Sequence, residues 1–348
     1  MLYCGKFHYF CVIQPNNIIN LYKFRKMQSI QTTKDKYRKL CEDRCDDIPI
    51  FMQAWWMEAV CVKKNWDVLL FEKGEIIMGA LPFLIIKKFG FKCIIEPQLS
   101  QFNGVWLNYK EISNLKKQNY SVEKEILNNL IQQLESLHFH YFNQNFHYSF
   151  TNWQPFYWRG FKQTTYYTYR INGIADTNKI FSEFHIFKQR HILKAKKKTH
   201  VDFNMSIDEF YKFHSNSLSS KGKKVYYKAE FFKNMAESAI NRNQGAIISI
   251  KDNDENIHSA MFVVWDINSA YYLVSAIDPK YKSSGASILM VWEAILFLTN
   301  KTQIFDFEGS MIEGVAKANQ EFGAELTPYF NISKNNSLLF SLLLKFKK

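Results

Sequence analysis

The sequence predicts an α/β (α+β) protein with two domains side by side, each a central, mostly antiparallel mixed sheet flanked by helices. The chain has 348 residues, and at about 100–200 residues per domain this length favours two domains. Hydrophobic residues make up 47% of it and charged residues 22%, which is typical of a packed globular protein and excludes a disordered chain. In the second half, segments of strand periodicity alternate with segments of helical periodicity in a regular order.

The first half is expected to open with helices and to continue as an antiparallel sheet. Two helices are predicted within residues 34–63, and the second is apolar enough to be buried. A further helix is predicted with Ser121 as its N-cap and a periodic apolar face. The strands are predicted by apolar runs between turn residues and by aromatic-rich runs, at 66–72, 76–89, 91–96, 138–150 and 164–171.

The second half begins with a long predicted helix from Asp176 to His200. The segments that follow are a strand, two helices, three antiparallel strands, a helix, a strand, a helix and a last strand. The first of the two adjacent helices starts with the capping box Ser206-x-x-Glu209. The strands are predicted at 201–205, 245–251, 257–266, 270–278, 303–308 and 325–332.

This order of elements is that of the GNAT acyltransferase fold, and three segments carry the resemblance. Residues 188–198 are similar to the basic helix of FemAB-type transferases, and 210–235 to the helix pair that follows it. Residues 305–330 resemble the ending of GNAT/FemAB-like acetyltransferases of the polysaccharide-associated type. The resemblance implies two GNAT-like domains, of which the first is a degenerate copy. The expected divisions are a loose N-terminal arm (1–33), a degenerate GNAT-like domain (34–172), a GNAT-like acyltransferase domain (173–333) and a C-terminal tail (334–348).

A loop between a predicted strand and a predicted helix carries the candidate donor-binding residues, which are Lys282, Ser283, Ser284, Gly285, Ala286 and Ser287. The first turn of a helix favours phosphate through its unpaired N–H groups and its dipole. The resemblance implies acyl-CoA, such as acetyl-CoA, as the co-substrate. Ser-Ser-Gly is also an ordinary start of a helix. The single glycine departs from the Gly/Ala-rich loop of typical GNAT enzymes and argues against ordinary acetyl-CoA binding.

The candidate catalytic residues are Glu308, Asp306 and Tyr227. Strand alternation places Asp306 and Glu308 on one face and the phenylalanines between and before them on the other. Acyl transfer to an amine needs a base for the ammonium proton, and Glu308 is the preferred candidate. The alternative is that one carboxylate caps the next loop or pairs with a lysine. Tyr227, with Tyr226 beside it, is a candidate general acid, although aromatic residues in such a chain are more often core.

The predicted basic helix places Arg190, Lys194 and Lys197 on one side at helical spacing. The whole chain has 45 Lys and Arg against 32 Asp and Glu, a net charge of +13, which attracts phosphate-bearing partners. A solvated helix face is one interpretation. The resemblance suggests instead that this helix approaches a phosphate-bearing acceptor or tRNA.

The favoured hypothesis is an N-acyltransferase that moves an acyl group from acyl-CoA to an amino group of a sugar or cell-envelope precursor by direct attack. A second hypothesis, implied by the FemAB resemblance, is aminoacyl transfer from aminoacyl-tRNA. A third is a non-catalytic basic binding protein on the same fold. The single-glycine loop favours the third hypothesis, and the Asp306/Glu308 pair argues against it.

The cysteine pattern and the lack of long apolar runs predict a cytoplasmic protein without a metal or a membrane span. No apolar run reaches the roughly 18 residues that a span needs. No second cysteine pair stands at zinc-ligand spacing, and a reducing compartment suits thiols so unevenly placed. The tail is expected to be a docked terminal element, with a surface anchor as the alternative. The true start is expected at Met1 or Met27. The cysteines are Cys4, Cys11, Cys41, Cys45, Cys61 and Cys93.

Overall fold

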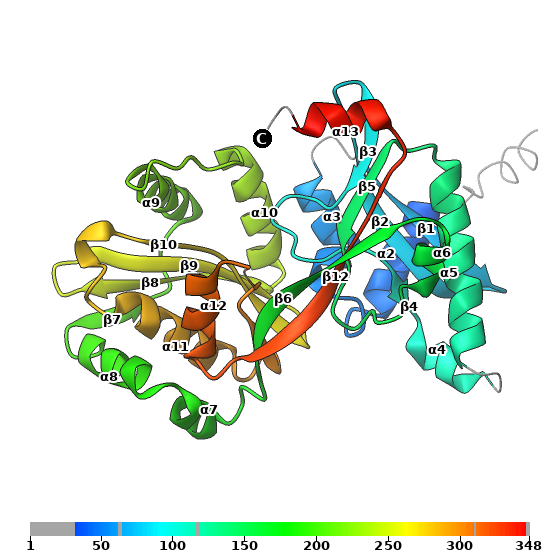
Figure 1. Ribbon diagram of the computed structural model, residues 1–348. Coiled ribbons are helices and arrows are strands. Elements are labelled where there is room, and N and C mark those ends of the chain that lie inside the picture. The colour runs from blue at the N-terminus through cyan, green and yellow to red at the C-terminus, as the bar shows by residue number, and fades with distance from the viewer. Residues whose placement is uncertain (1–31, 62–64, 116–118, 310, 346–348) are drawn as a thin grey trace, which may run out of the picture.

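Figure 1 shows the computed structural model, in which one continuous sheet runs through two halves of the chain. It describes residues 32–61, 65–115, 119–309 and 311–345. Of the arm expected at 1–33, all but Thr32 and Thr33 lie outside the described residues. Thr32 is the N-cap of the first described helix: its side chain accepts the amide of Asp35, and the Asp35 carboxylate accepts the amide of Thr32.

The first half supplies the helical start and the antiparallel strands that its sequence predicts. Its elements are α2 (Thr33–Asp43), η1 (Ile50–Met52), α3 (Ala54–Val60), β1 (Trp66–Lys73), β2 (Ile76–Lys88), β3 (Phe91–Ile95), β4 (Trp106–Leu107), α4 (Tyr109–Asn114), α5 (Asn119–Ser136), β5 (Tyr141–Asn145), α6 (Gln154–Trp158) and β6 (Lys162–Asn172). The domain boundary expected at 172/173 falls directly after β6 and stays a prediction.

The second half has the order of strands and helices that its sequence predicts. Its elements are α7 (Thr177–Glu183), α8 (Ile186–Ala195), β7 (Thr199–Asp202), α9 (Ile207–Ser219), α10 (Ala229–Asn241), β8 (Gly245–Asp252), β9 (Ile257–Trp265), β10 (Ser269–Ile277), η3 (Pro279–Tyr281), α11 (Ala286–Leu298), β11 (Ile304–Asp306), α12 (Glu313–Gln320), β12 (Glu325–Asn335) and α13 (Leu338–Lys345).

The strands follow one another in the order β1-β2-β3-β5-β12-β6-β11-β10-β9-β8-β7, and β4 pairs with β2 beside this path. Two neighbouring pairs are parallel, β3 with β5 and β10 with β11, and the other pairs are antiparallel. Residues 245–277 form the predicted antiparallel meander. The predicted fold class, a mixed and mostly antiparallel sheet flanked by helices, is therefore confirmed.

Each half inserts its last strand into the sheet of the other half. β12 is the last strand of the second half along the chain, yet it lies between β5 and β6 of the first half. β6 ends the first half, yet its other edge pairs with β11 of the second half. Figure 1 shows these two long strands crossing together from one half to the other. The two sheets that the sequence predicts are thereby joined into one.

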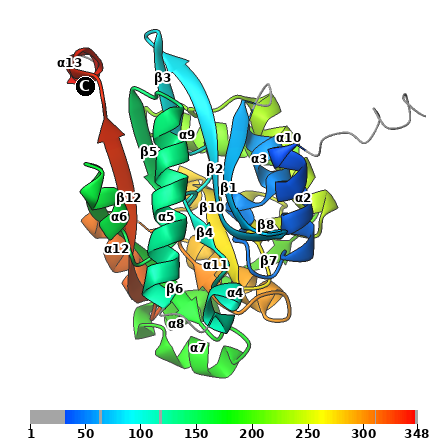
Figure 2. The same cartoon turned by 90° about the vertical axis from the view of Figure 1, so that its right-hand side faces the viewer.

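Helices cover both faces of this sheet and enclose three apolar cores. One core spans both halves, and joins α2 and α3 of the first half to α9 and α10 of the second. A second core lies between the sheet and the helices α7, α8 and α11. The third packs α5 against the first-half strands, and Figure 2 shows α5 on the face of that sheet opposite to α2 and α3. The shared core fixes the first half against the second.

The single helix predicted from Asp176 to His200 is wrong, because the chain breaks it at Phe184 and His185. Asp176 does cap α7, since its carboxylate accepts the amide of Lys179 at 3.1 Å. Phe184 and His185 are extended, with ψ of 140° and 138°. The Phe184 ring packs on Trp292 and Phe322, with centroids 5.5 and 5.2 Å away. Burial of this ring against Trp292 of α11 and against Phe322, which follows α12, outweighs the helical propensity of the segment.

Ser121 is not an N-cap, since α5 already includes Asn119. The apolar residues that predict this helix are nevertheless all buried, namely Val122, Ile126, Leu130, Ile131 and Leu134.

The tail ends in α13, which docks on the first half through one aromatic side chain. Phe340 is buried and packs on Phe91 and Tyr141, with ring centroids 5.3 and 5.4 Å away. Within the described ranges, no helix is long and apolar enough to cross a membrane. Cys41, Cys45, Cys61 and Cys93 are free thiols, and Cys45 lies just beyond α2 rather than in it. A cytoplasmic location stays a prediction.

Candidate active site

The parallel strands β10 and β11 pair over only three residues and then part. Ser269, Ala270 and Tyr271 pair with Ile304, Phe305 and Asp306. Beyond this point β10 continues beside β9, whereas the amide of Phe307 bonds to the carbonyl of Tyr169 on β6 at 2.9 Å. The helix α11 begins shortly after β10, so the same end of the parallel pair holds the predicted carboxylates and the predicted donor loop. An opening between parallel strands, next to a helix start, is a usual place for ligands in such sheets.

Asp306 is fully buried where the two strands part. Its Oδ1 atom accepts hydrogen bonds from the Thr168 hydroxyl, from the Glu308 amide at 2.7 Å and from the Gln101 amide nitrogen at 3.5 Å. No described residue bonds to its Oδ2 atom. Burial raises the pKa of Asp306 to about 6, although these hydrogen bonds and the charge of Arg170 act in the opposite direction.

Glu308 lies two residues beyond Asp306, where β11 ends, while Phe305 and Phe307 enter the core beside α11. The shared face expected from strand alternation stays a prediction. The Oε1 atom of Glu308 is buried, and no described residue bonds to it. Burial, and then the charge of Asp306, raise the pKa of Glu308 well above its usual range. Burial thus disfavours the ionised form of both carboxyls, and the charge of Asp306 disfavours it further at Glu308.

The backbone at Glu308 is held in an uncommon conformation. Glu308 has φ of 60° and Gly309 has φ of 67°. A Cβ atom at Gly309 would lie 2.1 Å from the carbonyl oxygen of Tyr167, so only glycine fits against β6 there. Positive φ at a residue that is not glycine is typical of functional sites held by their surroundings. The turn directs the Glu308 carboxyl away from the strand path.

Two residues of the first half, which the sequence reasoning missed, also belong to this site. Gln101 bonds to Asp306. The Glu96 carboxylate accepts the backbone amide and the side-chain amide of Asn145, each at 3.0 Å, and burial raises its pKa to about 8. One signal could have found Glu96: like Glu308, it directly follows an apolar strand.

Two phenols connect the carboxylates of the two halves. Burial is the first cause that raises the pKa of Tyr226 and of Tyr329, and the charges of Glu96 and Glu308 act on both. Tyr329 is buried on β12 and faces Tyr166 of β6, whereas Tyr226 is 67% exposed. Glu96, Glu308 and these two phenols therefore surround one region at the junction of the halves.

Tyr227 lies in the core between α9 and α10 and not beside the carboxylates. Its ring is 7% exposed and stacks on His214 and Phe232, with centroids 6.1 and 5.9 Å away. Burial raises the pKa of its phenol, and no described residue bonds to its hydroxyl. Its neighbour Tyr226 is instead the phenol whose pKa is raised by burial and then by the charge of Glu308. A catalytic role of Tyr227 stays a prediction.

The predicted donor loop begins α11 but uses several of its own amides. The Ala286 amide bonds to the Ser284 hydroxyl at 3.2 Å, and those of Ile288 and Leu289 bond to the Gly285 carbonyl at 3.1 and 3.0 Å. Lys282 and Ser283 are exposed, whereas Gly285 and Ala286 are buried. Together with Ser287, these residues offer a phosphate group fewer free amides than a glycine-rich loop does.

The structure brings the donor loop and the basic helix together. Gly285 has φ of 82°, and a Cβ atom there would lie 3.0 Å from the carbonyl oxygen of His191 on α8. Lys196 bonds to Glu293 of α11 at 2.9 Å, which also fixes the two helices. Arg190 and Lys194 are exposed on α8, whereas Lys197 is exposed beyond the end of this helix at Ala195, together with Lys196 and Lys198. The helical spacing predicted for Lys197 is therefore wrong. The loop and these cations thus form neighbouring parts of one basic surface, separate in sequence from the carboxylates.

Metal ligation finds no support in the described ranges, where no group of three or more His, Cys, Asp or Glu residues could hold a metal ion. The polar groups of the site are instead carboxyls, phenols and amides, which suit the binding of an amine and the transfer of its proton.

Comparisons with known proteins give one family-model match and several similar folds. Residues 189–310 match the family model described as "Acetyltransferase (GNAT) domain", and no curated protein matches the chain. The chain is similar to the crystal structure of FemX, with 11% identity and a TM-score of 0.67, over 92% of this chain and 100% of that one. It is also similar to L-PGS from Bacillus licheniformis, with 8% identity and a TM-score of 0.55, over 92% and 98% of the two chains.

A third similar structure is a tandem GNAT protein from the clavulanic acid biosynthesis pathway. It has 7% identity and a TM-score of 0.50, over 89% of this chain and 96% of that one. Identities this low establish the fold, and the function has to be argued from the residues of the site.

Proposed function

We propose that this chain, which carries a GNAT acetyltransferase domain within a tandem GNAT-type fold, is an N-acyltransferase that acts on a primary amine at the junction of its two halves. The observation that carries the proposal is the pair Asp306 and Glu308 at the point where β10 and β11 part, with Asp306 fully buried and Glu308 half-buried with a buried Oε1 atom. Both carboxyls have an oxygen without a described partner, which is costly in a buried position unless a ligand satisfies it.

The pair has the charge that an ammonium substrate needs. The pKa of Asp306, about 6, leaves this carboxyl mainly ionised at neutral pH, and its charge attracts the ammonium group. Burial and the charge of Asp306 favour the neutral form of Glu308, whereas a bound cation lowers the pKa of Glu308, because an opposite charge favours the ionised form. The ionised Glu308 is the base that accepts a proton from the ammonium group.

Transfer follows by direct attack. The ammonium group first gives a proton to Glu308. The neutral nitrogen then forms a bond to the acyl carbon, and the bond from that carbon to the leaving sulfur or oxygen breaks. The nitrogen loses its second proton and the leaving group takes up one, a transfer that we assign to Tyr226, whose phenol gives its proton to the leaving group and receives that of the nitrogen. The products are an amide and the free thiol or hydroxyl of the donor. The chain contributes positioning and charge rather than a covalent intermediate.

The donor proposed first is an acyl-CoA, held at the start of α11. Support comes from the GNAT match over 189–310 and from the helix start beside the exposed Lys282 and Ser283. The acceptor proposed is an amino group of a sugar or cell-envelope precursor, on the family resemblance of residues 305–330. Direct attack requires only that the acceptor be an amine.

A second candidate donor is an aminoacyl-tRNA, and two observations favour it. The amides of Ala286 and Ile288 at the start of α11 are already bonded within the loop, which leaves fewer donors for a pyrophosphate group. The exposed cations on and just beyond α8, beside that loop, match an extended phosphate backbone better than a single nucleotide. The chemistry at Asp306 and Glu308 is the same for both donors, because both present an activated acyl carbon.

A thermal-shift series with the full chain separates the candidates. Each donor that binds the native state raises the melting temperature. A rise with CoA and acetyl-CoA and none with charged tRNA supports the first donor, and the reverse supports the second. The bound donor is then incubated with glucosamine-type and peptide amines, and amide product is followed by mass spectrometry. Failure of every donor to bind would contradict the proposal and support a binding protein without catalysis.

A further inference from the structure

A cavity of about 320 Å³ lies at the junction of the two halves, away from the proposed active site. We propose that it is a binding site for an uncharged small molecule that has an aromatic or apolar body and a hydrogen-bond acceptor such as a carbonyl oxygen. Neither Asp306, Glu308 nor any residue of the donor loop lines it. It opens where β10 and β11 begin, at Ser269 and Ile304, whereas the carboxylates stand where β11 ends.

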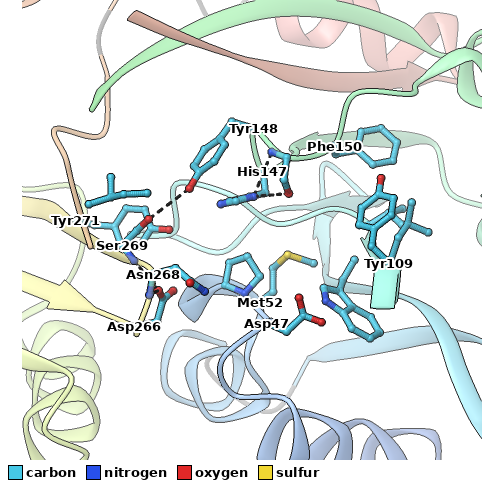
Figure 3. Close-up of a pocket in the computed structure, with 16 residues that line it drawn as sticks. Asp47, Met52, Tyr109, His147, Tyr148, Phe150, Asp266, Asn268, Ser269 and Tyr271 are labelled. Carbon is cyan, nitrogen blue, oxygen red and sulfur yellow. Dashed lines mark hydrogen bonds between the residues drawn. The ribbon is translucent and has the colours of Figure 1, made fainter. Parts of the chain in front are cut away.

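The cavity is built between two diverging segments of the first half. After the bridge between Asn103 and Phe146, the chain at 105–109 turns to pair with β2, while the chain at 147–150 leaves the sheet. Residues 266–271 of the second half close the remaining side. Figure 3 shows the side chains of these segments around one space. Its size is within the range of small-molecule sites.

The walls are mainly apolar and aromatic. Met52, Leu107, Phe150 and Tyr271 form buried parts of the lining, and the exposed Asp47 and Tyr109 mark its mouth. Such a wall favours a ligand with an apolar or aromatic body, because apolar surface is removed from water on both sides.

The two carboxylates of the lining are already satisfied. Asp47 pairs with Arg44 at 2.5 Å. Asp266 accepts the backbone amides of Ile50, Asn268 and Ser269 at 2.9, 2.9 and 2.8 Å. The lining holds neither lysine nor arginine, so no cationic side chain of the lining would pair with an anion. A cation would find both carboxylates engaged, and the site therefore favours an uncharged ligand.

Two N–H groups of the lining have no acceptor among the described residues. The indole nitrogen of Trp106 is buried, and no described residue accepts its hydrogen. The Nδ1 atom of His147 accepts the Ser149 amide at 3.3 Å, and burial, together with the charge of Arg170, lowers the pKa of this ring to about 3. The ring is therefore neutral with its hydrogen on Nε2, a second donor. Figure 3 shows the His147 ring extending into the space.

Two donors without acceptors in a mostly apolar cavity define the ligand. An acceptor atom removes the cost of a buried unpaired N–H group, whereas a ligand that is itself only a donor does not. The Tyr148 hydroxyl already shares a hydrogen bond with Ser269 at 3.3 Å, so it does not compete for that acceptor. The class that fits is a neutral aromatic or aliphatic carbonyl compound.

Three probes of similar shape test this assignment: acetophenone (neutral acceptor), benzoate (anion) and benzylammonium (cation). The indole N–H signals of the ¹⁵N-labelled full chain are recorded by NMR, and Trp106→Phe identifies the signal of Trp106 by its loss. We expect acetophenone to shift that signal in a saturable way and the two ions to leave it in place at equal concentration. Ligand-observed NMR should show acetophenone binding about fivefold weaker in Trp106→Phe, the factor for one lost hydrogen bond.

Trp158→Phe is the matched control, because Trp158 is half exposed on α6 and outside the cavity; it should bind acetophenone as the parent chain does. His147→Gln, at a partly exposed position, is the second variant if Trp106→Phe does not fold, and should also weaken binding. The proposal is overturned if no probe moves the Trp106 signal, if either ion binds as tightly as acetophenone, or if both lining variants bind it unchanged.

Discussion

The carboxylate of Asp306 accepts a hydrogen bond from the backbone amide of Glu308 at 2.7 Å, and Glu308 has φ of 60°. A left-handed conformation costs a residue other than glycine roughly 1–2 kcal/mol, and this bond offsets part of that cost. Asp306 therefore contributes to the site in two ways. It supplies charge, and it holds the backbone that aims the Glu308 carboxyl.

Glu308→Gln should retain the fold and lose turnover. The substitution conserves shape, and burial already favours the neutral form of Glu308. Loss of the base should lower kcat by roughly 10²–10⁴, with little change in the affinity for the donor, which is bound at a separate loop. Steady-state kinetics, with either donor that binds, provide the measurement.

Asp306→Asn separates the roles within the pair. If Asp306 acts by attracting the ammonium group, its loss should raise KM for the amine more than it lowers kcat. A fully active Glu308→Gln beside an inactive Asp306→Asn would show that Asp306 is the base. Full activity of both variants would assign the two carboxylates a structural role.

The stability of the chain should depend on the ionisation of Asp306. Its pKa is raised from 3.8 to about 6, so the folded state binds the proton more tightly than the unfolded state. The stability from this protonation is complete below the unfolded pKa and is lost as the pH rises through about 6. The loss amounts to about 3 kcal/mol at most. Urea unfolding of the parent chain and of Asp306→Asn between about pH 4 and pH 8 measures it.

As the pH rises, the unfolding free energy of the parent chain should therefore fall relative to that of Asp306→Asn. A difference that stays constant across this range would contradict a raised pKa at Asp306, because linkage requires the slope.

Gly309→Ala should destabilise the chain strongly. The new Cβ atom would lie 2.1 Å from the Tyr167 carbonyl oxygen and 2.8 Å from the Thr168 Cα atom, and φ is 67°. Strain and overlap together should cost more than about 2 kcal/mol. Gly173→Ala is the matched control, with φ of 66° and no atom within 4 Å of its Cβ position, and should cost only about 1 kcal/mol. Equal losses in urea unfolding would show that β6 moves freely at this position.

Removing the exposed cations on and just beyond α8 should discriminate between the two donors. In the triple variant Arg190→Gln, Lys194→Gln and Lys197→Gln, binding of charged tRNA should weaken. The slope of log affinity against log salt concentration should also fall by about 2 to 3, since each phosphate contact contributes about 0.7–0.9. Acetyl-CoA binding at the loop should change little.

The control for this variant removes the same charge from the first half, at the exposed Lys73, Lys87 and Lys110. Its tRNA salt dependence should stay near that of the parent chain. If both triple variants weaken tRNA binding alike, the net charge of the chain attracts RNA and α8 is no specific surface.

Local periodicity predicts most elements of this fold but not how they pair. The alternation of residues 245–277 suffices for the meander, because consecutive antiparallel strands need only short turns. The pairing of Phe330 with Thr165 joins residues far apart in sequence, and nothing local encodes it. The extended conformation of Phe184 is not predicted for a similar reason, because it follows from burial of the ring against Trp292 and Phe322.

The site is predicted in part by the same logic. Asp306 and Glu308 are found from alternation on one strand end, which is a local property. Glu96, Gln101 and Tyr329 reach the site from other strands and loops, so their proximity to the pair depends on the tertiary fold. The neighbours Tyr226 and Tyr227 show why sequence alone cannot choose between two adjacent tyrosines. Whether a ring lies in the core or in the cleft depends on packing and not on residue type.

The insertion of β6 and β12 into each other's halves makes the two GNAT-type units inseparable. A fragment cut at 172/173 would keep β6 without its neighbour β12, and the other fragment would keep β12 without β6 and β5. Each piece would expose strand edges in the middle of its own sheet, which promotes aggregation. A change that removes the strands of one half therefore also breaks the sheet of the other, so that both halves must be retained together for either to fold.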